Sequence, residues 1–213
     1  MIRQDPILIA APPRCGTTML AGLLHYHGVW VGRSRTTMYP GTNSNFGSEN
    51  TDIKRIMKHM ASKAGYRNWK LPFPDPKGKD QEQIKRRIVS FVPEKTSWLV
   101  KTSWCLIYWK FWRAAFPKAR WVFPVRDPSK IVDSMNRHPG MRSHPEEEKW
   151  QYIIHLLQLG TDIVDSGAIH IFVDAEKLAN RDSEEIDKLF MFLKMVPDYE
   201  VVNNWIKPEM LKR

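Results

Sequence analysis

Short apolar runs alternate with amphipathic stretches along this chain. Four runs have the length and apolar content of buried parallel strands: Ile7–Ala11, Trp98–Val100, Arg120–Val125 and Ala168–Val173. Segments with the apolar spacing of helices lie between and after them: Thr17–His27, Thr51–Lys63, Asp80–Phe91, Cys105–Phe116, Ser129–Arg137, Pro145–Ser166 and Ser183–Lys194. This alternation predicts an α/β fold in three layers, with a central parallel sheet flanked by helices.

Two segments lack either periodicity. Residues 32–50 are rich in Gly, Ser, Thr and Asn, and residues 66–80 are interrupted by three prolines. A loop as long as residues 32–50 in a compact domain is usually functional or mobile. Thr51 is the expected cap of the helix that follows the first loop. With 213 residues and no shift in composition, the chain is expected to form a single domain over residues 1–213.

The junction between the first strand and the first helix carries the strongest local signal, PRCGTT. Gly16 allows the backbone to approach a ligand closely, and the N–H groups at the start of a helix attract anions. Arg14 adds a formal positive charge, and Thr17 and Thr18 add hydroxyl groups. This junction is therefore expected to bind a phosphate or sulfate ester.

The same loop excludes two common phosphate-binding motifs. A Walker A loop ends in Gly-Lys-Ser/Thr, whereas here Gly16 is followed by Thr17. A phosphatase loop built on a cysteine needs an arginine several residues later, but GTTMLA follows Cys15. We therefore interpret Cys15 as a small loop residue and not as a nucleophile.

Three basic residues each follow the carboxyl end of a predicted strand: Arg14, Lys101 and Arg126. In parallel α/β sheets, ligands bind outside these strand ends. The three cations are thus expected to line one crevice.

Composition and charge limit the kinds of ligand and the location expected for this chain. The net charge of +10 and the pI near 9.6 favour an acidic ligand, but no basic-aromatic repeat or zinc-finger spacing indicates a nucleic-acid partner. The two cysteines indicate a reducing compartment, and no apolar run near the N-terminus reaches the length of a membrane span. A cytoplasmic location is expected, and no cluster with metal-ligand spacing predicts a metal.

Several motifs, in order along residues 6–196, resemble those of sulfotransferases that use 3′-phosphoadenosine 5′-phosphosulfate (PAPS), as in small bacterial or phage-type members. PRCGTT is similar to the 5′-phosphosulfate loop, and WVFPVRDPSKIVDSM is similar to the 3′-phosphate motif. LVKTSW, NSNFGSEN and IFVDAEKL resemble weaker motifs of the same family.

The resemblance implies a P-loop-like fold and transfer of a sulfuryl group from PAPS to a hydroxyl or amine of a small molecule or glycan. The released product would be 3′-phosphoadenosine 5′-phosphate (PAP). The implied donor-binding residues are Arg14, Cys15, Gly16, Thr17, Thr18, Arg126 and Ser134. Arg14 and Lys101 would neutralise charge during transfer.

The general base departs from the family pattern. Cytosolic members carry histidine where this chain has Ser103, and a serine cannot accept the proton near neutral pH. Glu49 is the leading candidate, because some sulfotransferases use a glutamate in the corresponding loop. Capping of the following helix is an equally weighted role for Glu49, and His25 and His27 are fallback bases.

Two other functions remain open from the sequence. The first is a nucleotide or small-molecule kinase with a degenerate phosphate loop, although the Walker lysine is missing. The second is a non-catalytic protein that binds a nucleotide or another anion, which the absence of a histidine at position 103 favours.

Overall fold

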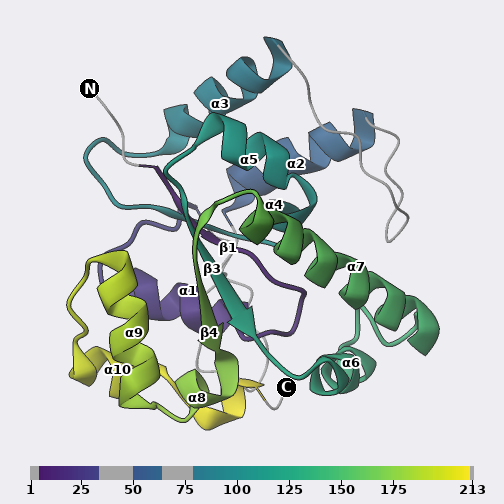
Figure 1. The fold of residues 1–213 in the computed structure, drawn as a ribbon, viewed down its shortest axis with the longest axis vertical. Helices are drawn as coiled ribbons and strands as arrows, with labels where there is room; N and C mark the ends of the chain where they lie inside the picture. Colours follow the sequence, from purple (N-terminus) through teal and green to yellow (C-terminus); the bar gives the residue numbers. More distant parts are fainter. Residues whose placement is uncertain (1–4, 34–49, 64–78, 212–213) are drawn as a thin grey trace.

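A parallel β-sheet forms the centre of the molecule. The computed structural model describes residues 5–33, 50–63 and 79–211, and within them the strands form a four-stranded sheet in the order β2-β1-β3-β4 (Figure 1). The strands are β1 (Ile7–Ile9), β2 (Leu99–Lys101), β3 (Arg120–Val125) and β4 (Ile169–Asp174). The α/β fold with a central parallel sheet is therefore confirmed.

The register of the strands aligns the carboxyl ends of β1 and β2, whereas β3 continues beyond them to Val125. Ile9 at the end of β1 is level with Lys101 in β2 and with Val122 in β3. Side chains alternate between the two faces of the sheet, so Ile7 and Ile9 enter one apolar cluster and Leu8 enters the other. Because both faces are buried, these strands appear in the sequence as continuous apolar runs.

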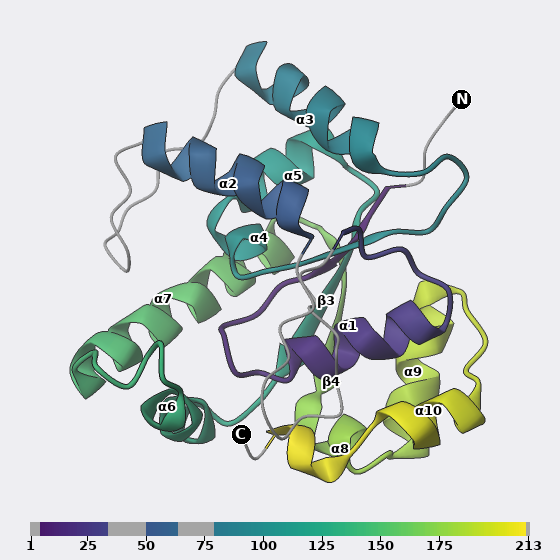
Figure 2. The same cartoon turned by 180° about the vertical axis from the view of Figure 1, so that it is seen from behind.

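Helices cover both faces of the sheet, as Figures 1 and 2 show from opposite sides. One face is covered by α1 (Thr17–Tyr26), α8 (Ala175–Ala179), α9 (Ser183–Leu193), α10 (Tyr199–Trp205) and the 3₁₀ turn η1 (Pro208–Leu211). The other face is covered by α2 (Thr51–Lys63), α3 (Lys79–Phe91), α4 (Trp104–Ile107), α5 (Trp109–Ala115) and α7 (Glu146–Asp165). The remaining helix, α6 (Pro128–Arg137), packs against α7 and the loop after β1.

Most predicted elements are confirmed to within one residue at each end, but the predicted helix Cys105–Phe116 is wrong. The chain forms α4 and α5 there, with Tyr108 between them at φ −105° and ψ 33°. Both helices send aromatic side chains into the same core, so the apolar spacing contains no sign of the break.

The expected cap of α2 is also wrong. The side-chain oxygen of Asn50 accepts hydrogen bonds from the backbone N–H groups of Asp52 and Ile53, each at 3.1 Å. Thr51 instead donates its hydroxyl to the carbonyl oxygen of Arg33 at 2.9 Å. Asn50 is buried, so its side-chain oxygen is held at the helix end and satisfies the amides that a cap must satisfy.

Three short elements near the C-terminus were not predicted: α8, α10 and η1. Asp174 caps α8 by accepting from the N–H of Glu176 at 2.8 Å, and Asp198 caps α10 by accepting from the N–H of Glu200 at 2.9 Å. These helices are too short for a clear apolar period, which is why only their caps mark them in the sequence.

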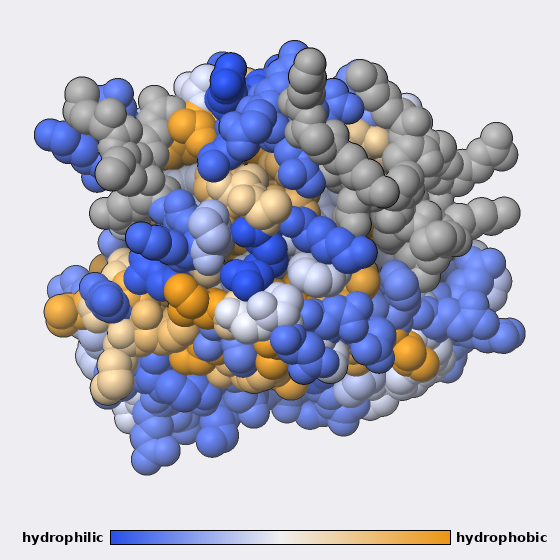
Figure 3. All heavy atoms as spheres, turned by 45° about the horizontal axis from the view of Figure 1, so that its top comes forward, coloured by the Kyte–Doolittle hydropathy of each residue, from blue (hydrophilic) through white to orange (hydrophobic). Residues whose placement is uncertain are grey.

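The surface carries mostly hydrophilic side chains on the face drawn in Figure 3, with smaller hydrophobic areas between them. In the described part of the chain, no helix combines the length and apolar content that crossing a bilayer requires. Within the same residues, no group of three or more His, Cys, Asp or Glu side chains is arranged to hold a metal ion.

Candidate functional site

The loop between β1 and α1 has an unusual backbone. Arg14 and Gly16 both adopt left-handed conformations, with φ of 72° and 75°. A Cβ atom on Gly16 would lie 2.9 Å from Cδ2 of Leu211, at the end of a flexible side chain that can shift. The loop therefore favours glycine at position 16 mainly because of its left-handed backbone.

Helix α1 begins directly after this loop, with Gly16 as its N-cap residue. Gly16 has no side chain that could accept a hydrogen bond from the first turn of the helix. The first N–H groups of an α-helix have no partners within the helix, and the helix dipole places partial positive charge there. The start of α1, at Thr17 and Thr18, is therefore suited to bind an anion.

The side chain of Arg14 connects this loop to α6. Its Nε donates a 2.9 Å hydrogen bond to the hydroxyl oxygen of Ser134, which is completely buried. The two residues are 120 positions apart in the sequence. The structure thus brings together one residue from each of the two motifs that sequence analysis assigned to anion binding.

The side chain of Arg126 supports the backbone of the same loop. It directly follows β3, and its Nη1 donates to the backbone carbonyl of Arg14 at 2.9 Å. Its Nη2 donates to the carbonyl of Leu211 at 2.8 Å, and its Nε lies 3.8 Å from Oε1 of Glu176. The Arg126 side chain is only 7% exposed, so these contacts hold a positive charge in an interior position.

Asp127 and Pro128 explain why α6 begins directly after Arg126. The Asp127 carboxylate accepts hydrogen bonds from Ser129, at 2.6 Å from the hydroxyl and 2.8 Å from the backbone N–H. These bonds lower the pKa of Asp127, so the cap is ionised and suits the positive end of the helix. Pro128 occupies the first turn, where no N–H is needed.

Cys15 does not have the properties of a nucleophile. Its side chain packs in an apolar cluster with Ile131 and Met135 of α6. Burial raises the pKa of this thiol to about 12, although the charge of Arg126 acts in the opposite direction. The thiol is therefore neutral near pH 7, and only the backbone of Cys15 is available to a ligand in the loop.

Lys101 lies at the same edge of the sheet. It ends β2 beside Ile9 and is partly buried, which places it among the strand ends that carry the site. Glu49 lies outside the described residues, so its position is not part of the geometry. Ser103 begins the turn into α4 and is not a base.

The two fallback bases lie at the far end of α1. This helix has 10 residues, so its last turn is about 15 Å from the loop. His27 accepts from the N–H of Asp198 at 2.9 Å, and its other ring nitrogen lies 2.7 Å from the carbonyl oxygen of Leu23. His25 is exposed on that same last turn. Their positions do not support a role for either histidine at the loop.

Three neighbours of the site were missed from the sequence. Glu176 contacts both Arg126 and Lys130, at 3.8 Å and 2.6 Å. The carbonyl of Leu211 accepts from Arg126, and the pKa of His138 is lowered by burial and, to a smaller extent, by the charge of Arg14. Glu176, one of the two acidic residues of IFVDAEKL, offered a signal in the sequence, whereas the backbone carbonyl of Leu211 offered none.

Residues 6–195 match the model of the sulfotransferase family. No match was found among curated protein sequences.

The fold also resembles solved structures. A sulfotransferase domain from the curacin biosynthetic pathway aligns with a TM-score of 0.58 at 15% identity, covering 100% of this chain and 87% of that one. The sulfotransferase STF1 from Mycobacterium tuberculosis H37Rv aligns with a TM-score of 0.59 at 14% identity, covering 96% of this chain and 71% of that one. Because the family model spans most of the sequence, the chain belongs to the sulfotransferase family.

Proposed function

We propose that this protein transfers a sulfuryl group from PAPS to a hydroxyl or amine of a small molecule or glycan. The observation that carries the proposal is the hydrogen bond from Arg14 to the buried Ser134, which joins the loop after β1 to α6. In our proposal these two elements hold the two anionic ends of one nucleotide. Membership of the sulfotransferase family supports this reaction type in general terms.

The residues present fit a donor with two separate anionic groups. The amides at the start of α1 and the guanidinium of Arg14 suit the phosphosulfate. Arg126 and Ser134 suit the 3′-phosphate, because both lie in the strand-to-helix unit that follows β3. Nε of Arg126 makes no hydrogen bond within the described residues; it is buried and lies 3.8 Å from Oε1 of Glu176.

The chemistry requires charge stabilisation and a base. As the bond between sulfur and the 5′-phosphate oxygen breaks, negative charge develops on PAP, and a new bond forms between sulfur and the acceptor oxygen or nitrogen. Arg14, Lys101 and the loop amides would stabilise that charge. Glu49 would take the acceptor proton, since Ser103 cannot and the Cys15 thiol is neutral.

A transfer assay tests the proposal. The protein is incubated with PAPS carrying labelled sulfate and with pooled metabolites and glycans from the native host, and labelled products are separated by mass. We expect a labelled product with the wild-type chain and none with Arg14→Ala. Binding of PAP without transfer to any acceptor would instead identify a binding protein, and magnesium-dependent consumption of ATP would identify a kinase.

A further inference from the structure

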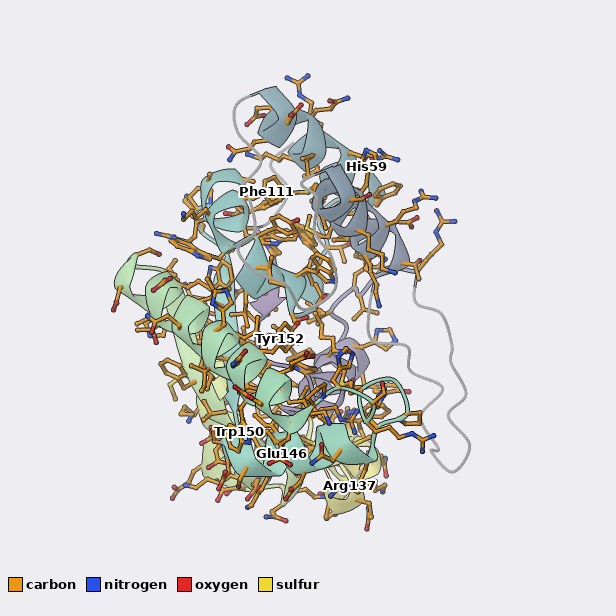
Figure 4. All side chains as sticks on the ribbon, turned by 90° about the vertical axis from the view of Figure 1, so that its right-hand side faces the viewer. His59, Phe111, Arg137, Glu146, Trp150 and Tyr152 are labelled. Carbon is orange, nitrogen blue, oxygen red and sulfur yellow. The ribbon has the colours of Figure 1, made fainter. Side chains whose placement is uncertain are left out.

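The turn that follows α6 places a histidine beside the proposed donor site. His138 is the C-cap residue of α6 and comes four residues after Ser134, a spacing at which side chains of a helix lie on the same face. Ser134 accepts the hydrogen bond from Arg14. His138 therefore lies one helical turn beyond the residue that binds the Arg14 side chain. Arg137 and Glu146, labelled in Figure 4, mark the two ends of this turn.

Backbone contacts fix the ring of His138. Nδ1 accepts a 3.1 Å hydrogen bond from the backbone N–H of Gly140. The carbonyl of His138 accepts from the N–H groups of Met141 and Arg142, both at 2.9 Å. The residue is thus part of a tight turn and not of an irregular loop.

The buried side chain of Lys149 contacts the same turn. Lys149 is 2% exposed, and its Nζ donates to the side-chain oxygen of Asn136 at 2.6 Å and lies 3.5 Å from the carbonyl oxygen of Arg142. These contacts tie the last turn of α6 and the following residues to α7. The position of His138 is consequently set by packing on both sides.

The contact with Gly140 determines which nitrogen carries the proton. An N–H donor at Nδ1 requires a lone pair there, so the neutral ring has its hydrogen on Nε2. Burial and the positive charge of Arg14 both lower the pKa of His138, which favours this neutral ring near pH 7. Within the described residues, Nε2 makes no hydrogen bond.

We infer that His138 is a donor-binding residue whose Nε2–H donates a hydrogen bond to an anionic oxygen of the nucleotide held at Arg14. This inference rests on the proposed function and adds a residue to its binding site. It also assigns His138 a role other than that of the general base, because the nitrogen available to a ligand already carries a proton. The turn between α6 and α7 thus becomes part of the donor site.

Binding of PAP tests the inference with matched variants. His138→Leu removes the donor and is expected to raise the Kd for PAP at least about tenfold, since a hydrogen bond to a charged group is lost. His138→Gln places an amide N–H near the position of Nε2 and is expected to stay within about threefold of the wild type. His144→Leu is the control, because His144 lies in the same turn but pairs with Glu148 at 3.4 Å. Equal Kd values for His138→Leu and the wild type would overturn the inference.

A spectroscopic readout separates binding from folding. Long-range ¹H–¹⁵N correlation spectra of the histidine rings are expected to show the Nε2-protonated tautomer for His138, and its Nε2 signal is expected to move when PAP is added. A ring protonated on Nδ1 would refute the inference even in a well-folded protein. Failure of the wild type to bind PAP, with the expected tautomer still present, would count against the proposed function instead.

Discussion

Nη1 of Arg126 donates a 2.9 Å hydrogen bond to the backbone carbonyl of Arg14. The residue expected to bind one phosphate therefore also supports the loop expected to bind the other. Because Arg14 has a left-handed backbone, its carbonyl direction depends on a fixed partner. A substitution of Arg126 will consequently affect both the shape of the loop and any direct contact with a ligand.

Replacement of Arg126 by alanine should weaken PAP binding by about 1.5–3 kcal/mol, the value of a hydrogen bond to a charged group. AMP lacks the 3′-phosphate, so its binding should fall less, by the part of the effect that comes from the loop. Titration calorimetry with both nucleotides measures the difference. Arg113→Ala is the control, because Arg113 also donates to a carbonyl, that of Ser166 at 2.9 Å, but near the end of α7. Equal losses for PAP and AMP would assign Arg126 a structural role alone.

Nucleotide preference follows from the composition of the loop. No lysine follows Gly16 to reach the outer phosphates of ATP, and the loop cation Arg14 precedes that glycine. We expect PAP to bind more tightly than ATP in calorimetric titrations, with or without magnesium. Tighter or equal binding of ATP would contradict the assignment of the donor and favour a kinase.

Substitution of Glu49 by glutamine should lower turnover about 100- to 10,000-fold, the usual contribution of a general base. PAP affinity and the melting temperature should remain near the wild-type values, because the side-chain oxygen of Asn50 accepts hydrogen bonds from the first turn of α2 and glutamine keeps the shape of Glu49. Asp52→Asn serves as the control, since Asp52 pairs with Arg33 at 3.3 Å and lies nearby in the chain. Near-normal turnover of Glu49→Gln would eliminate this residue as the base.

The thiol of Cys15 should be inert in the folded protein. Its pKa is raised by burial to about 12, from 9.0, so the thiolate is absent at neutral pH. We expect no alkylation of Cys15 by iodoacetamide at pH 8 in the folded chain, and Cys15→Ala should retain sulfuryl transfer. Rapid alkylation or loss of transfer without loss of folding would show a reactive cysteine.

The same pKa shift predicts a stability change at high pH. The folded state holds the thiol proton more tightly than the unfolded state, so the stabilisation is complete below pH 9 and is lost as the pH rises from 9 toward 12. The free energy of unfolding from urea titrations should therefore fall more steeply over this range for the wild type than for Cys15→Ala. If the free energy of unfolding fell equally with pH for the wild type and for Cys15→Ala, the Cys15 thiol would not be buried in the folded state.

Local patterns in the sequence predicted the elements of the sheet and a glycine-containing, positively charged loop after β1. Period and cap signals depend on residues up to about four positions apart, so β3 and α6 could be expected from the apolar run and from Asp127 and Pro128. The short helices α8 and α10 were missed because their length gives no period. The break at Tyr108 was missed because α4 and α5 bury aromatic residues in the same cluster.

By itself, the sequence determined that a positively charged loop would stand between a buried strand and a helix, with Arg14 and Gly16 at its centre. Only the tertiary structure decided that Arg14 meets Ser134 across 120 positions, that Arg126 supports the loop carbonyl, and that the Cys15 thiol is buried. The physical reason is that such contacts depend on how α1 and α6 pack at the ends of the parallel strands. That packing is a property of the whole core, and no local period or cap encodes it.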